Sequence, residues 1–398
     1  MKKYLWLFLT ALCSYIFYFF SLPPSTPYTP PPLPVQEQLL LVPLDSRPPC
    51  TLMAQDLGRL ASIDVILPPK ELLDNYRTPA NREKLSSWLS HNAGKCPAVI
   101  SGDLLIHGGL LASRLPQGTV NDEQNFFKLL QTMPSGEDIT VFSIIPRLLV
   151  SDNLLPDAWY QWHLMRYSTL RDIVEQFGDY PSTAQLEEIK NKIPQEILQK
   201  YNVLYSTNDS FNKQLAALCA AKNYTLVIGQ DDAQPFGLPN RNRTHAEAYM
   251  RRAGLSSAST TTCGADEIAQ MLIARRFCQI NNYKPKFYIE YTTSSAATAI
   301  MPYMAVTAEA ALLDKIKFTG GMLTQNLNEA DVILYVHCGS AKEPANEKIA
   351  QKLQALLNSG KHVAVIDASE DYESSQMLLP VLLANNVTIN KLVSYSAW

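Results

Sequence analysis

The sequence Tyr-Thr-Leu-Val-Ile-Gly-Gln-Asp-Asp-Ala-Gln-Pro-Phe-Gly at residues 224–237 governs the interpretation of the whole chain. Its apolar run, residues 226–228, is short and flanked by turn formers, which is typical of a strand buried on both faces. Gly229 lets the backbone open out, and two adjacent carboxylates, Asp231 and Asp232, follow. Ligands of parallel α/β folds bind at the carboxyl ends of the strands. These two acids are therefore either a catalytic pair or a loop cap, since Asp also favours turns and helix N-termini.

Strand-like apolar runs alternate with helical patterns over most of the chain. They fall at residues 39–44, 64–67, 98–101, 139–145, 226–228, 287–291, 332–336, 362–366 and 391–395. This alternation predicts an α/β fold built from parallel βαβ units. Two arrangements remain open: a single irregular (β/α) barrel, or a barrel-like N-terminal part followed by a flavodoxin-like part from about Phe287 onward.

The N-terminus differs from the rest of the chain. Lys2 and Lys3 precede an uncharged apolar stretch, which predicts a signal anchor or transmembrane helix at residues 1–22. A Pro-rich linker follows at residues 23–37. Because positive charges stay on the cytoplasmic side, the sequence predicts a membrane-anchored, extracytoplasmic protein on the cell surface or periplasmic side.

The body divides into two predicted parts. The first is a barrel-like α/β catalytic domain at residues 38–285, with a helical insertion at residues 159–221 where a long polar stretch has a helical pattern. The second is a C-terminal α/β part at residues 286–398. The chain stops at Trp398 directly after an apolar strand and without a closing helix, which indicates a truncated product.

Composition excludes several classes of protein. With 46% hydrophobic and 18% charged residues the body is globular, and a net charge of -3 without a basic run argues against nucleic acid as a partner. The seven cysteines show no C-x-x-C spacing, so neither a zinc ribbon nor a disulfide scaffold is predicted. No phosphate-binding loop, dinucleotide fingerprint or G-x-S-x-G elbow occurs, and we predict no cofactor.

Nearly every predicted strand is followed by a polar side chain. The carboxyl ends of parallel strands share one edge of a sheet, so these side chains should converge on one hollow. The turn at Gly108 and Gly109 permits close backbone approach to a ligand. The candidate catalytic residues are Asp231 and Asp232, and the candidate substrate-binding residues are Asp45, Arg47, Asp103, His107, Arg114, Arg147 and Glu290.

Four separated motifs carry a resemblance to a known family. They are Pro-Leu-Asp-Ser-Arg-Pro-Pro at 43–49, Gly-Gly-Leu-Leu-Ala-Ser-Arg at 108–114, Gly-Gln-Asp-Asp-Ala at 229–233 and Gly-Ala-Asp-Glu at 264–267. In this order they resemble the bacterial family called domain of unknown function 4127. Its members continue past the point at which this chain ends, so the resemblance implies a C-terminally truncated member. The adjacent Asp-Asp is also similar to the catalytic pair of barrel enzymes that cleave N-acetylglucosaminides by substrate assistance.

The leading hypothesis is a glycoside hydrolase that acts outside the membrane on an N-acetylated sugar or cell-wall glycan. One of Asp231 and Asp232 would donate a proton to the leaving oxygen, and the other would hold the substrate's acetamido group or stabilise the developing cation. Trp159 or Tyr160 could stack on a sugar ring.

Two alternatives stay open. The first is a metal-dependent deacetylase or amidase, although no H-E-x-x-H or H-x-x-E-H spacing occurs and no metal is predicted. Its plausible ligands are Asp45, Asp103, His107, Asp231 and His337. The second is a non-catalytic, membrane-tethered glycan-binding protein.

Overall fold

The computed structural model describes residues 34–76, 78–113, 120–149, 159–178, 180–339, 346–368 and 377–397. These residues belong to one compact unit, Val35–Trp398. Within the described ranges no helix has both the length and the apolar character that a membrane span requires. The predicted anchor at residues 1–22, most of the predicted linker, and Arg114 lie outside the described residues.

Six parallel strands form the first sheet, in the order β2-β1-β3-β4-β5-β6. The strands are β1 (Glu37–Val42), β2 (Ile63–Ile66), β3 (Ala98–Ser101), β4 (Ile139–Ile145), β5 (Thr225–Gln230) and β6 (Thr260–Cys263). All six residues of β5 are buried, which confirms the strand expected from the apolar run at residues 226–228.

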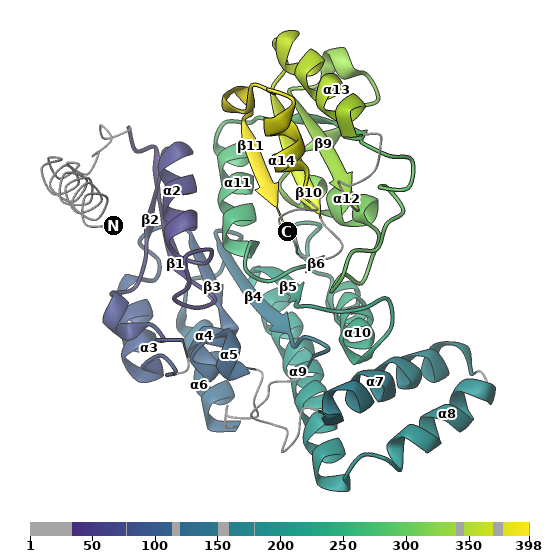
Figure 1. Cartoon of the computed structure of the whole chain (residues 1–398). Helices are drawn as coiled ribbons and strands as arrows, with labels where there is room; N and C mark the ends of the chain where they lie inside the picture. The colour runs from purple at the N-terminus through teal and green to yellow at the C-terminus, as the bar shows by residue number, and fades with distance from the viewer. Residues whose placement is uncertain are drawn as a thin grey trace, which may run out of the picture. The chain divides into compact units, whose positions relative to one another are not determined.

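Alternating side chains of these strands fill two hydrophobic cores, one on each face of the first sheet. Leu40 and Val42 of β1 pack with α3, α4, α6, α9 and α10 on one face. Leu39 and Leu41 pack with α2 and α11 on the other, where these two helices lie side by side (Figure 1). The helices of this part are α2 (Leu52–Leu60), α3 (Arg82–Asn92), α4 (Gly102–His107), α5 (Leu110–Ser113), α6 (Val120–Thr132), α10 (Leu238–Ala253) and α11 (Ile268–Ile280), with the short helix η1 (Lys70–Leu72).

The second sheet has five parallel strands in the order β8-β7-β9-β10-β11. Its strands are β7 (Lys286–Tyr291), β8 (Met322–Leu323), β9 (Val332–Cys338), β10 (Val363–Ala368) and β11 (Ser394–Ala397). Numbered along the chain this order is 2-1-3-4-5, which is the flavodoxin order, so the flavodoxin-like C-terminal part is confirmed. Its helices are α12 (Ala308–Phe318), α13 (Asn346–Asn358), α14 (Leu378–Ala384), η3 (Leu327–Glu329) and η5 (Ile389–Lys391).

The parallel βαβ units are confirmed, but the N-terminal part is an open sheet and not a barrel. In the described part of the chain, β2 pairs only with β1 and β6 pairs only with β5, so the two edges never meet. The first sheet shows the same 2-1-3-4-5 order as the second, extended by β6. Both halves of the chain are therefore doubly wound, with helices on both faces of a twisted sheet.

The predicted helical insertion consists of three helices. They are α7 (Trp159–Phe177), α8 (Tyr180–Lys190) and α9 (Gln195–Lys222). Helices α7 and α8 lie side by side (Figure 1). Together with the first half of α9 they enclose a separate core that includes Leu164, Tyr201 and Tyr205. The second half of α9 instead contributes Phe211 and Leu215 to the core of the first sheet. This long helix thus joins the insertion firmly to the sheet.

Candidate functional site

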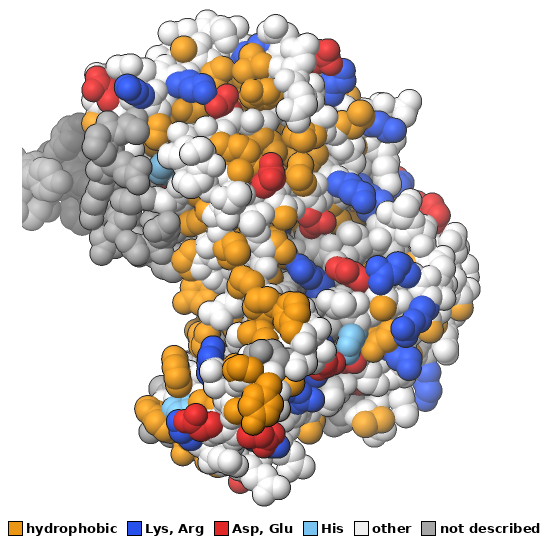
Figure 2. All heavy atoms as spheres, turned by 90° about the vertical axis from the view of Figure 1, so that its right-hand side faces the viewer, with side chains coloured by type: hydrophobic (Ala, Val, Ile, Leu, Met, Phe, Trp, Pro, Cys, Tyr) orange, Lys and Arg blue, Asp and Glu red, His pale blue; other side chains and the backbone are white. Residues whose placement is uncertain are grey.

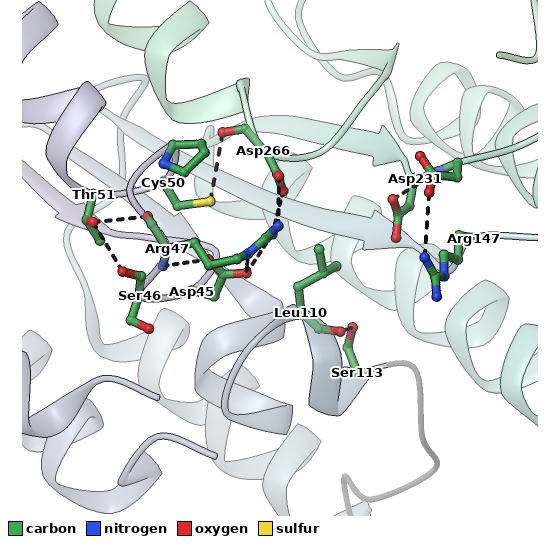
Figure 3. A network of polar contacts seen from close by, with 12 residues as sticks. Asp45, Ser46, Arg47, Cys50, Thr51, Leu110, Ser113, Arg147, Asp231 and Asp266 are labelled. Atoms are coloured by element: carbon green, nitrogen blue, oxygen red, sulfur yellow. Dashed lines mark hydrogen bonds and ion pairs between the residues drawn. The ribbon is translucent and has the colours of Figure 1, made fainter. Parts of the chain in front are cut away.

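The polar residues predicted at strand ends gather at the carboxyl edge of the first sheet. Strand order reverses between β1 and β3, because β2 lies on the far side of β1. A doubly wound sheet binds ligands at this switch point, where the loops that leave the two strands part in opposite directions. Asp45 follows β1, and Asp103 follows β3. Figure 3 shows Asp231 and Arg147 near the ends of neighbouring strands of the same sheet.

Arg47 links the loop after β1 to the start of α11. Its Nε donates to Asp45 Oδ2 at 2.8 Å, and its Nη1 and Nη2 donate to the two carboxylate oxygens of Asp266 at 2.9 and 2.6 Å (Figure 3). Asp45 is only 2% exposed, and the guanidinium and the backbone N–H of Arg47 both donate to its buried carboxylate oxygens. This fork orders two loops that are more than 200 residues apart in sequence.

Asp103 is the buried acid of the site. Its Oδ2 accepts a hydrogen bond from the Ile144 N–H at 2.9 Å, and the residue is 5% exposed. Burial raises the pKa of this carboxyl to about 7; the Ile144 hydrogen bond opposes the rise, and the charge of Asp231 adds to it. Asp103 and Asp231 are thus close enough to interact electrostatically, as expected for acids at one sheet edge.

A cavity of about 230 Å³ opens beside Asp103. Its polar lining consists of Asp103, His107, Ser113, Glu123, Ser143, Thr207 and Asn208. Among the described residues the buried Nδ1 of His107 has no hydrogen-bond partner, and burial lowers the pKa of this imidazole to about 4. At neutral pH the cavity therefore presents a neutral imidazole and a carboxyl that is close to half protonated.

The two adjacent aspartates have different surroundings. Asp231 is 8% exposed, and its Oδ1 accepts the backbone N–H of Asp232 at 2.9 Å. The Asp232 side chain is 36% exposed, and its Oδ2 lies 3.7 Å from Nη1 of Arg147. Both aspartates line a small cavity of about 60 Å³ together with Glu267 and Lys315. One buried and one half-exposed carboxylate can hold different roles although they are neighbours in sequence.

Two residues predicted from the sequence lie away from this network, and a third falls outside the described residues. Glu290 lies on β7 of the second sheet, where its carboxylate forms an ion pair with Lys352 of α13. His337 lies on β9, and its Nδ1 is 2.9 Å from Oγ1 of Thr292. The guanidinium of Arg114 falls outside the described residues, so its part in the site stays a prediction.

Two acids that the motif analysis did not select belong to the network. Asp266 pairs with Arg47, and Asp74 Oδ1 accepts the Ser46 N–H at 2.7 Å. A side chain on Gly109 would meet Asp74, because a Cβ there would lie 3.3 Å from Asp74 Cγ, and the φ of +131° also favours glycine. The sequence did contain a signal for Asp266, because this residue belongs to Gly-Ala-Asp-Glu, one of the four motifs that carry the family resemblance.

Metal ligation finds no specific support in the described part of the chain. No group of three or more His, Cys, Asp or Glu side chains there is arranged to hold a metal ion. Of the ligands considered from the sequence, Asp45 is already bound by Arg47, and His337 is in the other sheet. The metal-dependent hypothesis stays a prediction that elemental analysis of the purified protein would test.

Comparison with known proteins gives one family and one structural match. A family model described as "Protein of unknown function (DUF4127)" matches residues 39–398. No curated protein matches the chain. Among solved structures, GH26A from Muricauda sp. matches with 11% sequence identity over 80% of each chain, at a TM-score of 0.19.

Proposed function

We propose that this chain, which belongs to the DUF4127 family, is a hydrolase that cleaves a glycosidic bond in an N-acetylated sugar or cell-wall glycan. Asp103 is the general acid, and Asp231 is the second carboxylate of the pair. One observation carries the proposal: a buried carboxyl with a pKa of about 7 lies beside a cavity and within electrostatic range of a second carboxylate. Glycoside hydrolysis requires two acids, one protonated and one ionised, and different surroundings of the two carboxyl groups produce this difference.

The reaction needs one proton donor and one proton acceptor. Asp103 gives its proton to the glycosidic oxygen while the bond from that oxygen to the anomeric carbon breaks. A water molecule adds to the anomeric carbon, and its proton passes to a carboxylate, which we assign to Asp231. The products are two sugars with free hydroxyl groups, so no oxidant or cofactor is consumed.

The remaining residues position the substrate. Asp232, beside Arg147, accepts a hydrogen bond from the acetamido N–H, which keeps a part of the role expected from the Asp-Asp motif. His107 offers a buried ring nitrogen to a hydroxyl or amide group in the cavity. The network of Asp45, Arg47 and Asp266 fixes the loops around them.

Nitrophenyl glycosides, N-acetylhexosaminides included, test this assignment on the full-length chain. We expect Asp103→Asn and Asp231→Asn each to lower kcat/KM by about 10²–10⁴-fold, and the activity of the unaltered chain to fall as pH rises through about 7. Asp56→Asn is the matched control, because that carboxylate pairs with Arg59 on the exposed face of α2. Unaltered turnover in Asp103→Asn would refute the role of Asp103.

We propose further that the enzyme works outside the membrane, held by residues 1–22. The support is the sequence: Lys2 and Lys3 precede a long uncharged stretch. A fusion of residues 1–37 to alkaline phosphatase, which is active only after export, should give active reporter. The reporter without these residues is the control. An expressed but inactive fusion would contradict the proposal.

A further inference from the structure

Two large aromatic side chains at the start of α7 face solvent. Trp159 is 58% exposed and Trp162 is 64% exposed. Between them lies His163, which is 5% exposed, with ring centroids 3.8 Å from Trp159 and 5.2 Å from Trp162. The imidazole Nδ1 is 3.1 Å from the carbonyl oxygen of Trp159. The buried imidazole thus contacts both indoles. We call Trp159 and Trp162 the indole platform.

The platform is tied to the loop that carries the paired aspartates. Further along α7, the Ser168 hydroxyl accepts the Leu238 N–H at 2.7 Å, and Asp172 Oδ2 accepts the Gly237 N–H at 2.8 Å. Both anchoring side chains are fully buried. Trp162 precedes Ser168 by six residues, which is about 9 Å along a helix. A ligand that extends out of the active-site region along α7 could therefore reach the indoles.

The charges on the insertion favour a neutral partner. Helices α7 and α8 carry Arg166, Arg171 and Lys190 against Asp172, Glu175, Glu187 and Glu188, so basic residues are not in excess. Figure 2 shows acidic and basic side chains interspersed with hydrophobic ones over the lower part of the face it displays. Helices that bind anionic lipid surfaces have a basic polar face, which is missing here. A polymer of neutral sugars needs no such charge.

We propose that the indole platform binds a polymeric glycan chain and holds it in line with the catalytic residues. Indole rings offer large, rigid, flat surfaces that lose little conformational entropy on binding. The C–H groups on the face of a sugar ring pack against such a surface, while the sugar hydroxyls stay in water. This inference deepens the proposed function and rests on it for the class of ligand: the natural substrate is a long glycan and not a short glycoside.

Affinity electrophoresis of the full-length chain through gels that contain glycol chitin tests the inference. The Asp103→Asn background is used throughout, so that hydrolysis does not erode the polymer and binding is measured apart from catalysis. We expect retardation of this chain by the polymer, and about tenfold weaker binding for each of Trp159→Ala and Trp162→Ala. Tyr180→Ala is the matched control, because that ring is 83% exposed on neighbouring α8 but lies outside the platform.

The outcomes separate this inference from the proposed function. Retardation that both tryptophan variants lose supports a glycan-binding platform even if no glycoside is hydrolysed. If nitrophenyl glycosides are hydrolysed but all variants are retarded equally, glycan binding by the indole platform is refuted and the proposed hydrolase activity stands. Unchanged melting temperatures exclude misfolding as the cause.

Discussion

Asp103 and His107 border one cavity, and burial moves their pKa values in opposite directions. The Asp103 carboxyl, with a pKa of about 7, keeps its proton at lower pH. Burial, reinforced by the charge of Arg82, lowers the pKa of His107 to about 4, so its ring is neutral at higher pH. From about pH 4 to pH 7 both groups are uncharged. A cavity with these walls suits hydroxyl and amide groups, which is consistent with a sugar as its ligand.

Replacing each residue should reveal two opposite pH dependences of the free energy of unfolding. The unshifted pKa values are 3.8 for Asp and 6.5 for His. The contribution of Asp103 to the free energy of unfolding therefore decreases as pH rises from about 4 to 7. The contribution of His107 decreases as pH falls from about 6.5 to 4. Between pH 4.5 and 6.5 we expect Asp103→Asn to gain stability with rising pH and His107→Gln to lose it, each by on the order of 3 kcal/mol. Urea unfolding at three pH values measures both slopes.

The unaltered chain is the internal control for this pair of variants. In that chain the pH dependences that Asp103 and His107 give to the free energy of unfolding have opposite signs over the same pH range. They should largely cancel, so that these two residues together leave the free energy of unfolding nearly independent of pH. Slopes of the same sign in both variants would show that the pKa values of Asp103 and His107 are not shifted in this way.

Asp266 shows how far reasoning from single residues reaches. The acids at strand ends could be predicted because Asp45, Asp103 and Asp231 each come at or shortly after the end of an apolar run. Asp266 precedes a helix, where an acid ordinarily interacts with the N-terminal dipole, so its local sequence favours a different role. Its partner, Arg47, is more than 200 residues away. Only the folded chain reveals that pairing, since no local pattern encodes it.

At the scale of elements, strands were predictable where they are apolar. Strands β3 and β4 have the bounds expected from their sequences. Strand β6, Thr-Thr-Thr-Cys, was missed because it is polar and occupies a sheet edge, where one side needs no apolar neighbour. The two-residue strand β8 is too short to leave any pattern.

Gly229 on β5 holds the Asp-Asp loop against two other elements. A Cβ at this position would lie 2.6 Å from Ile268 Cδ1, 2.7 Å from the Gly264 carbonyl oxygen and 2.8 Å from Ile144 Cδ1. We expect Gly229→Ala to lower the free energy of unfolding by about 3 kcal/mol, because a backbone oxygen cannot move aside as a side chain can. Chemical unfolding monitored by circular dichroism measures this loss.

Gly102 provides the matched control for that substitution. Gly102 directly follows strand β3 and is buried, but its Cβ would be no closer than 3.4 Å to any neighbour, which is ordinary van der Waals contact. Gly102→Ala should therefore change stability by less than about 1 kcal/mol. If both variants lost equal stability, the close packing around Gly229 would not be the cause.

For the whole molecule, the choice between a barrel and an open sheet could not be made from the sequence. Both architectures are built from the same βαβ units with the same apolar strands. They differ in whether the first and last strands pair, and that pairing joins residues distant in the chain. Here β2 and β6 remain at opposite edges, and the next strand, β7, begins the second sheet. The predicted site did not depend on this choice, because the carboxyl ends of the strands meet at one edge in either architecture.

The two sheets share packing, and this has a measurable consequence. Phe318 ends α12, which follows the first strand of the second sheet, yet its ring is 4% exposed and belongs to a core of the first sheet. Lys315 of the same helix donates to the carbonyl oxygen of Cys263 at 2.9 Å, which adds a polar link to β6. Neither sheet can therefore unfold without exposing buried surface of the other.

We expect Phe318→Ala to lower the stability of both sheets together, by about 3 kcal/mol, because it leaves a cavity at their junction. Three of the five tryptophans, Trp88, Trp159 and Trp162, lie in the first part of the chain, so tryptophan fluorescence is weighted towards that part, whereas far-ultraviolet circular dichroism reports on both sheets. The two urea transitions should coincide in the unaltered chain and shift equally in the variant. Leu313→Ala on the exposed face of α12 is the control. Separate transitions, or a shift in circular dichroism alone, would mean that the sheets fold as independent units, because a shared core must lose its structure in one step.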